Sequence, residues 1–152
     1  MGIRVATMDD IPRLLELGRQ LHQESPRWSR LSFNRDRAQA MLARLIGSTS
    51  SVVFVAERAG VVVGGIAGVV EQHWSSDDLV AHEVSLFIEP GARGGYLATK
   101  LIVALTEWGR LKGAVWLHAG TSTGLDPERT AGLYEALGFT RCTIGLEVMY
   151  GR

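Results

Sequence analysis

The apolar positions of the chain follow two spacings, one typical of strands and one typical of helices. Valine-rich or alternating runs predict strands at residues 3–6, 52–57, 61–71, 80–88, 114–118 and 139–149. Apolar residues three and four positions apart predict helices at residues 10–23 and 34–46, after Gly95 as far as Lys112, and between Pro127 and Gly138. The order β-α-α-β-β-β-α-β-α-β predicts one α/β (α+β) domain over residues 1–152, with a mixed, mostly antiparallel sheet flanked by helices.

Local signals sharpen several of these boundaries. The turn Arg58-Ala59-Gly60 favours a tight antiparallel hairpin between two of the predicted strands. Thr7, followed three positions later by Asp10, is typical of a helix start. Asp126 is expected to cap the short helix, with Pro127 in its first turn and Gly138 at its end.

The most informative stretch is residues 89–102, where an apolar strand runs through glycines directly into an amphipathic helix. The first turn of a helix has N–H groups without intrahelical partners, and Gly94 and Gly95 allow a phosphate to approach them closely. Arg93 adds a fixed positive charge beside them. The pattern indicates an anion site, while a plain structural turn remains the alternative that the same residues allow.

Composition narrows the class of protein. Sixteen basic and sixteen acidic side chains give a formal net charge of zero, so nothing in the charge balance favours a nucleic acid or an anionic membrane as partner. The single cysteine, Cys142, excludes an internal disulfide and fits a reducing cytoplasm. The longest apolar run, residues 61–70, is too short to span a bilayer. We therefore expect a soluble, cytoplasmic protein.

Two motifs, in this order, resemble the GNAT N-acetyltransferase superfamily. The first is Ile-Glu-Pro-Gly-Ala-Arg-Gly-Gly at residues 88–95, and the second is Leu-Tyr-Glu-Ala-Leu-Gly-Phe at residues 133–139. The resemblance covers nearly the whole chain and implies a single GNAT-like acyltransferase domain. It also implies that acetyl coenzyme A (acetyl-CoA) is the co-substrate, with its pyrophosphate on the N-terminus of the long helix.

The same resemblance assigns the coenzyme-binding residues. Arg93 takes the first position of the family's phosphate-binding pattern and Ala98 the last, and Thr99 follows as a hydroxyl donor. Tyr96 stands where the family usually has its middle glycine, and its side chain would crowd the pyrophosphate if it pointed inward. The full expected set, including strand residues whose backbone would contact the pantetheine arm, is Leu86, Phe87, Ile88, Arg93, Gly94, Gly95, Tyr96, Leu97, Ala98 and Thr99.

Two residues are candidates for catalysis. Tyr134 matches the family's tyrosine at the sulfur, where a phenol can protonate the departing thiolate; a core tyrosine is the structural alternative. Glu83 resembles the family's base, although a solvated or substrate-binding carboxylate and a base at His82 are alternatives. Alternation along the strand predicts that Glu83 shares a face with Ser85 and Phe87, opposite the face of the intervening residues.

The resemblance thus implies an N-acetyltransferase that acts on a small-molecule or peptide amine by direct attack. A non-catalytic acyl-CoA-binding sensor or interaction domain is the alternative. The four histidines have no close metal-ligand spacing, so no metal is predicted. A homodimer is common in such folds and is expected here by analogy.

Overall fold

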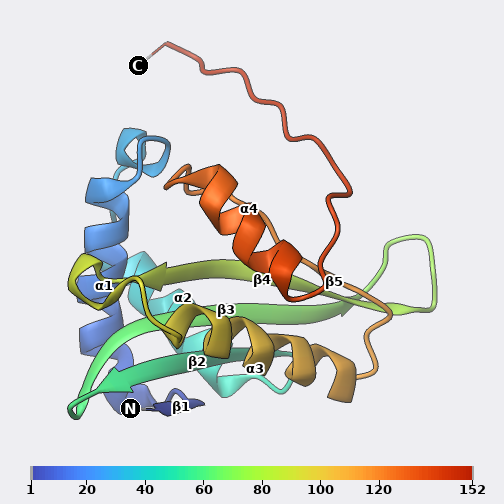
Figure 1. Ribbon diagram of the computed structural model, residues 1–152, viewed down its shortest axis with the longest axis horizontal. Helices are drawn as coiled ribbons and strands as arrows, with labels where there is room; N and C mark the ends of the chain where they lie inside the picture. Colours follow the sequence, from blue (N-terminus) through green and yellow to red (C-terminus); the bar gives the residue numbers. More distant parts are fainter. Residues whose placement is uncertain (1, 152) are drawn as a thin grey trace.

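A computed structural model describes residues 2–151 as a five-stranded sheet with strands in sequence order, β1-β2-β3-β4-β5 (Figure 1). The strands are β1 (Gly2–Val5), β2 (Ser51–Arg58), β3 (Val61–Gln72), β4 (Leu79–Ile88) and β5 (Leu117–His118). Neighbouring strands from β1 to β4 are antiparallel, and β5 is parallel to β4. The predicted fold class, a mixed and mostly antiparallel sheet flanked by helices, is confirmed.

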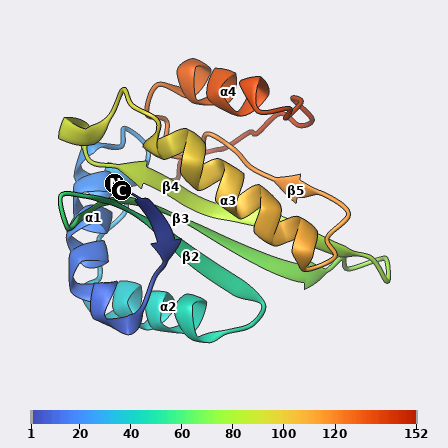
Figure 2. The same cartoon turned by 60° about the horizontal axis from the view of Figure 1, so that its bottom comes forward.

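Helices cover both faces of the sheet (Figure 2). The helices are α1 (Ile11–Glu24), α2 (Arg35–Gly47), α3 (Leu97–Leu111) and α4 (Pro127–Ala136), with short 3-10 turns at Met8–Asp10, Trp28–Arg30 and Pro90–Ala92. One apolar core joins α1 and α2 to one face of the sheet through Leu14, Leu21 and Leu45. A second joins α3 and α4 to the opposite face through Leu101, Leu105 and Tyr134. Within residues 2–151, no helix has the length and apolar character needed to cross a membrane.

The local signals explain most element boundaries. Ala59 and Gly60 both have positive φ, at 52° and 77°, which produces the tight hairpin expected between β2 and β3. Asn34 accepts a hydrogen bond from the Arg37 N–H at 2.9 Å and caps α2. Gly113, with φ of 85°, ends α3 as predicted.

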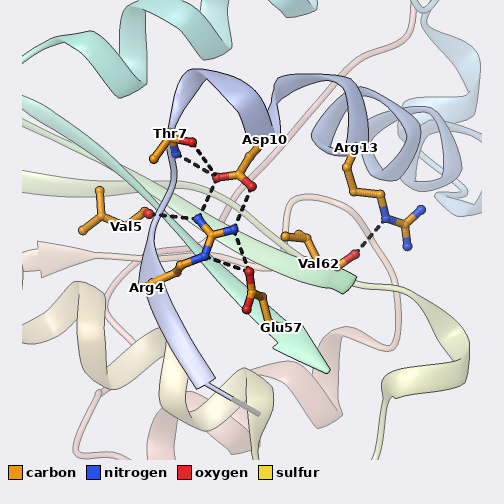
Figure 3. A network of polar contacts seen from close by, with 7 residues as sticks. All are labelled: Arg4, Val5, Thr7, Asp10, Arg13, Glu57 and Val62. Carbon is orange, nitrogen blue, oxygen red and sulfur yellow. Dashed lines mark hydrogen bonds and ion pairs between the residues drawn. The ribbon is translucent and has the colours of Figure 1, made fainter. Parts of the chain in front are cut away.

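A partly buried ion-pair network fixes β1 against its neighbours (Figure 3). Arg4 donates to both carboxylate oxygens of Asp10 at 2.8 Å and to Glu57 on β2 at 2.8 Å. The Thr7 N–H also donates to Asp10 at 2.8 Å, so the expected helix-start signal is present. Asp10 is only 9% exposed, and the Arg4 guanidinium lowers the pKa of its carboxyl. The network therefore joins β1, β2 and the start of α1.

Three expectations about the C-terminal third are wrong. Residues 139–149 form no strand, and the segment arcs away from the sheet after α4 (Figure 1). The strand expected at 114–118 is reduced to Leu117–His118, because only Ala81 and His82 pair with it. Asp126 makes no side-chain cap, because it adopts a left-handed conformation with φ of 42° in place of the extended backbone typical of a capping residue.

The close packing of β3 against β4 gives a test of the fold. A methyl group added at Gly64 would lie 2.8 Å from the Phe87 carbonyl oxygen and 2.9 Å from Ile88 Cγ1. We predict that Gly64→Ala lowers the free energy of unfolding by about 1 to 3 kcal/mol, measured by urea denaturation. Gly132→Ala is the matched control, because a methyl group there meets nothing within 4 Å and should stabilise α4 by about 0.5 to 1 kcal/mol. A Gly64→Ala variant as stable as the wild type would contradict this packing.

Candidate active site

One edge of β4 is paired with β5 for only part of its length. β5 pairs with β4 only at Ala81 and His82. From Glu83 to Ile88, β4 is hydrogen-bonded to β3 on one edge and has no strand on the other within residues 2–151. Backbone groups on this open edge are free to bind an extended ligand with amide groups.

A β-bulge at Val84 turns Glu83 toward α3 and α4. Ala67 of β3 pairs with Ser85 and the next residue, Gly68, pairs with Glu83, so Val84 is the extra residue on β4. Ser85 therefore stays on the α1 and α2 face, whereas Glu83 lies with Leu86 on the opposite face. The expectation that Glu83 shares a face with Ser85 and Phe87 is wrong, because simple alternation does not include the bulge.

A cavity of about 440 Å³ opens where β4 and β5 separate. It brings together most of the predicted site residues: Glu83, Leu86, Phe87, Ile88, Arg93, Gly94, Gly95, Ala98 and Tyr134. Three predicted residues do not line it. Leu97 is buried in the core at 3% exposed, Thr99 lies beside the cavity on α3, and the side chain of Tyr96 is directed into solvent, 80% exposed. Tyr96 therefore does not crowd the cavity.

Glu83 is a half-buried carboxyl at the inner end of this cavity. Burial raises its pKa from an ordinary value of 4.5 to about 7, while the Gly120 N–H and the nearby Tyr134 hydroxyl act in the opposite direction. The Gly120 N–H lies 3.4 Å from a carboxylate oxygen. A carboxyl with this pKa is a proton acceptor at neutral pH and returns the proton readily.

Tyr134, on α4, is 6% exposed and packs edge-on against Phe139, with ring centroids 5.0 Å apart. Within residues 2–151 its buried hydroxyl makes no well-formed hydrogen bond, although it lies near the Glu83 carboxyl. Burial and the negative charge of Glu83 raise the pKa of this phenol, so it stays protonated. An unpaired buried hydroxyl is rare in folded proteins and indicates a group that a ligand satisfies.

Arg93 is already engaged by the protein. Its Nε donates to the Ile88 carbonyl oxygen at 2.7 Å, its two terminal nitrogens contact the Glu24 carboxylate at 2.5 and 2.7 Å, and its guanidinium lies 5.2 Å from the centre of the Phe87 ring. Arg93 thus ties the glycine loop to the end of β4 and to the end of α1.

The start of α3, beside the cavity, has backbone N–H groups without intrahelical partners. Gly94 has φ of 89°, a conformation that favours glycine, and a methyl group added there would meet nothing within 4 Å. The first N–H groups of α3, from Leu97 onward, precede the first intrahelical bond, which Lys100 makes to the Tyr96 carbonyl at 2.9 Å. Free N–H groups and the positive end of the helix dipole favour a phosphate here.

One wall of the cavity consists of residues that were not predicted from the sequence. Residues 120–123 and Arg129 line it opposite the glycine loop. Arg129 lies four residues before Leu133 on α4, so helical spacing from the second motif could have identified it. The loop has no such signal. It is held by long-range contacts, in which Ser25 donates to the Thr123 carbonyl at 2.5 Å and Arg27 donates to the Ser122 carbonyl.

His82, the alternative base, lies away from this site. It is placed opposite Val69 on β3, on the face of the sheet that packs against α1 and α2, and its Nε2 lies 3.4 Å from Glu71. Among the described residues, no three histidine, cysteine or acidic side chains cluster in a way that could hold a metal ion.

The fold and the cavity together define an acyltransferase-like site, and comparison with known proteins identifies the family. The acetyltransferase (GNAT) family model matches residues 16–139. The chain therefore belongs to the GNAT acetyltransferase family. A comparison with curated protein sequences finds no significant match.

Solved structures share the fold along nearly the whole chain. AAC(6')-Iy, in complex with the bisubstrate analogue CoA-S-monomethyl-acetylneamine, has a TM-score of 0.79 at 20% identity, covering 99% of this chain and 98% of that one. The aminoglycoside 6'-N-acetyltransferase AAC(6')-IG of Acinetobacter haemolyticus has a TM-score of 0.76 at 15% identity, covering 100% and 99%. An acetyltransferase of Trypanosoma brucei has a TM-score of 0.73 at 22% identity, covering 98% and 99%.

The raised pKa of Glu83 predicts that the stability of the protein depends on pH, and this can be measured without a substrate. In the unfolded chain the carboxyl ionises near pH 4.5, whereas in the folded protein it ionises only near pH 7. The free energy of unfolding therefore decreases as pH rises between these values, and Glu83→Gln removes that decrease. We predict that the stability of Glu83→Gln relative to wild type increases by about 1 to 3 kcal/mol from pH 4.5 to pH 8 in urea denaturation.

Asp77→Asn is the control for this measurement, because Asp77 lies in the exposed loop between β3 and β4. Its stability relative to wild type should be the same at the two pH values. If the change in relative stability between the two pH values is the same for Glu83→Gln and Asp77→Asn, the Glu83 carboxyl is not buried as described.

Proposed function

We propose that this chain transfers an acetyl group from acetyl-CoA to a primary amine, by direct attack of the amine on the thioester. The observation that best supports the proposal is the pairing of two groups in one cavity. Glu83 has a pKa of about 7, and the buried Tyr134 hydroxyl makes no well-formed hydrogen bond within residues 2–151. These are the proton acceptor and the proton donor that acyl transfer to an amine requires.

The cavity residues fit the shape and charge of acetyl-CoA. The glycine loop and the first N–H groups of α3 would hold the pyrophosphate, with Gly94, Gly95 and Ala98 leaving room for it. Arg129 supplies positive charge on the opposite wall. The open edge of β4, from Leu86 to Ile88, offers backbone groups to the amides of the pantetheine arm.

The chemistry then follows from the positions of these side chains. The amine nitrogen forms a bond to the thioester carbonyl carbon, the carbon–sulfur bond breaks, and the amine loses a proton. Glu83 accepts that proton, because its pKa places it near the optimum for a base at neutral pH. Tyr134 donates its hydroxyl proton to the departing thiolate, and a phenol kept neutral by burial is suited to that role.

The acceptor is proposed to be a small-molecule or peptide amine. One of the similar structures is described as an aminoglycoside 6'-N-acetyltransferase, and another is a complex with the bisubstrate analogue CoA-S-monomethyl-acetylneamine. Aminoglycosides are therefore the first acceptors to test, followed by polyamines, amino acids and peptides.

The proposal predicts separate effects on binding and turnover at Tyr134. Isothermal titration should detect acetyl-CoA binding, and a free-thiol assay with the amine panel should detect coenzyme A release. Tyr134→Phe should lower turnover at least tenfold and leave the acetyl-CoA dissociation constant within about threefold, because it removes the proton donor and keeps the ring packing. No binding heat at high micromolar protein would refute the proposal. Binding without thiol release across the panel would instead support an acyl-CoA-binding domain without catalysis.

The contacts of Arg93 with Ile88 and Glu24 predict how its removal changes coenzyme binding. Arg93→Ala removes the link between the glycine loop, Ile88 and Glu24, so we expect acetyl-CoA affinity to fall by about 1 to 3 kcal/mol in isothermal titration. Arg110→Ala is the control, because Arg110 lies at the far end of α3 and pairs with Glu107. An unchanged dissociation constant for Arg93→Ala would exclude a role for Arg93 in ordering the loop.

A further inference from the structure

A second cavity, of about 260 Å³, lies on the other side of β4 from the candidate active site. It is enclosed by α1, α2, the sheet and the turn that contains Trp28. Apart from His22 and Ser85, the side chains that line it are apolar, and no acidic, lysine or arginine side chain of the described residues is among them. A mostly apolar cavity with one or two polar groups is typical of a site for a small molecule.

His22 supplies a polar atom that the protein itself leaves unsatisfied. Its Nδ1 and the Tyr134 hydroxyl are the two buried side-chain polar atoms that make no well-formed hydrogen bond within residues 2–151. The imidazole is held between two rings, with its centroid 5.6 Å from that of Trp28 and 5.1 Å from that of Phe33. A buried polar atom without a partner is costly, so Nδ1 indicates a hydrogen-bonding group on a ligand. Each of the two cavities thus contains one such atom.

The size and lining of this cavity define the chemical class of its ligand. A dry apolar cavity of about 150 Å³ accommodates benzene, so this larger cavity accommodates an aromatic ring with a short substituent. Trp28, Phe33 and Phe87 supply ring faces and edges for it to pack against. A hydroxyl on the ring satisfies His22 Nδ1 in either tautomer, because a hydroxyl both donates and accepts. A polycation, in contrast, finds no carboxylate here.

The two cavities meet at β4. Phe87 lines both of them, and Val84, which lines this cavity, is the sequence neighbour of Glu83, which lines the other. From Glu83 to Ile88, one edge of β4 has no neighbouring strand within residues 2–151. A ligand held in this cavity can therefore extend a short chain past the open edge toward Glu83.

We propose that the acceptor amine carries a hydroxylated aromatic ring, and that this ring occupies the cavity between α1, α2 and β4. The ring packs against Trp28 and Phe33, its hydroxyl pairs with His22 Nδ1, and its alkylamine chain passes the open edge of β4 to Glu83. This inference rests on the proposed acetyl transfer, and it ranks aromatic amines above polycationic acceptors such as aminoglycosides.

A ring without an amine tests the cavity separately from acetyl transfer. Isothermal titration of the full chain with 4-ethylphenol should give a dissociation constant of about 1 mM or below. Ala38→Leu, which enlarges a lining residue of α2, should weaken this binding by about tenfold or more. Ala40→Leu is the matched control, because Ala40 is exposed on the same helix and does not line the cavity. No binding by the wild type, or equal weakening by the two variants, overturns the proposal.

The hydrogen bond to His22 has its own test. His22→Phe removes Nδ1 and keeps a ring between Trp28 and Phe33, so affinity for 4-ethylphenol should fall by about five- to tenfold while affinity for ethylbenzene stays within about twofold. His73→Phe is the control, because His73 lies in the loop between β3 and β4 and does not line the cavity. An equal change for the two ligands, or none for either, overturns the pairing with Nδ1.

A free-thiol assay with acetyl-CoA tests the acceptor role. We expect kcat/KM to be about tenfold or more higher for 4-(2-aminoethyl)phenol than for kanamycin or spermidine, and Ala38→Leu to lower only the former. A preference for the polycations that Ala38→Leu leaves unchanged overturns this inference, while the proposed acetyl transfer stands. No thiol release from any amine refutes the acetyl transfer and with it the acceptor role, and intact binding of 4-ethylphenol distinguishes that result.

Discussion

The early end of pairing between β4 and β5 is the constraint on which the site depends. After His82 the two strands separate, and the β-bulge at Val84 turns Glu83 toward the space that opens between them. A continuous ladder would leave no open edge for an extended ligand, and regular alternation would place the Glu83 carboxyl on the wrong face of the sheet. The separation of β5 from β4 therefore positions the cavity, and one extra residue in β4 determines which side chain supplies its acidic group.

The cavity combines two environments that its ligand needs. At the outer end, glycines and unpaired N–H groups at the start of α3 favour negative charge. At the inner end, apolar surroundings raise the pKa values of both Glu83 and Tyr134, which keeps a neutral phenol beside a carboxyl that titrates near neutrality. The helix start that favours an anion and the pair of titratable side chains thus line one cavity.

Much of the fold could be predicted from the sequence because its signals are local. The hairpin at Ala59-Gly60, the Asn34 cap and the glycine-containing start of α3 depend on residues a few positions apart. The bulge at Val84 and the engagement of Arg93 by Glu24 depend on contacts between distant parts of the chain, and no spacing rule reports them. The strand expected from the alternation in residues 139–149 does not form, because alternation in one segment does not provide a pairing partner in the sheet.

The end of α1 contacts both walls of the cavity. Glu24 holds Arg93 on the side of the glycine loop, and Ser25, the next residue, holds the loop at Thr123 on the other side. Ser25 is fully buried, so the distance between the two walls is fixed by the helix end and not by the loops themselves. Two adjacent residues at the end of one helix, neither of them in the cavity lining, therefore set the spacing of both cavity walls.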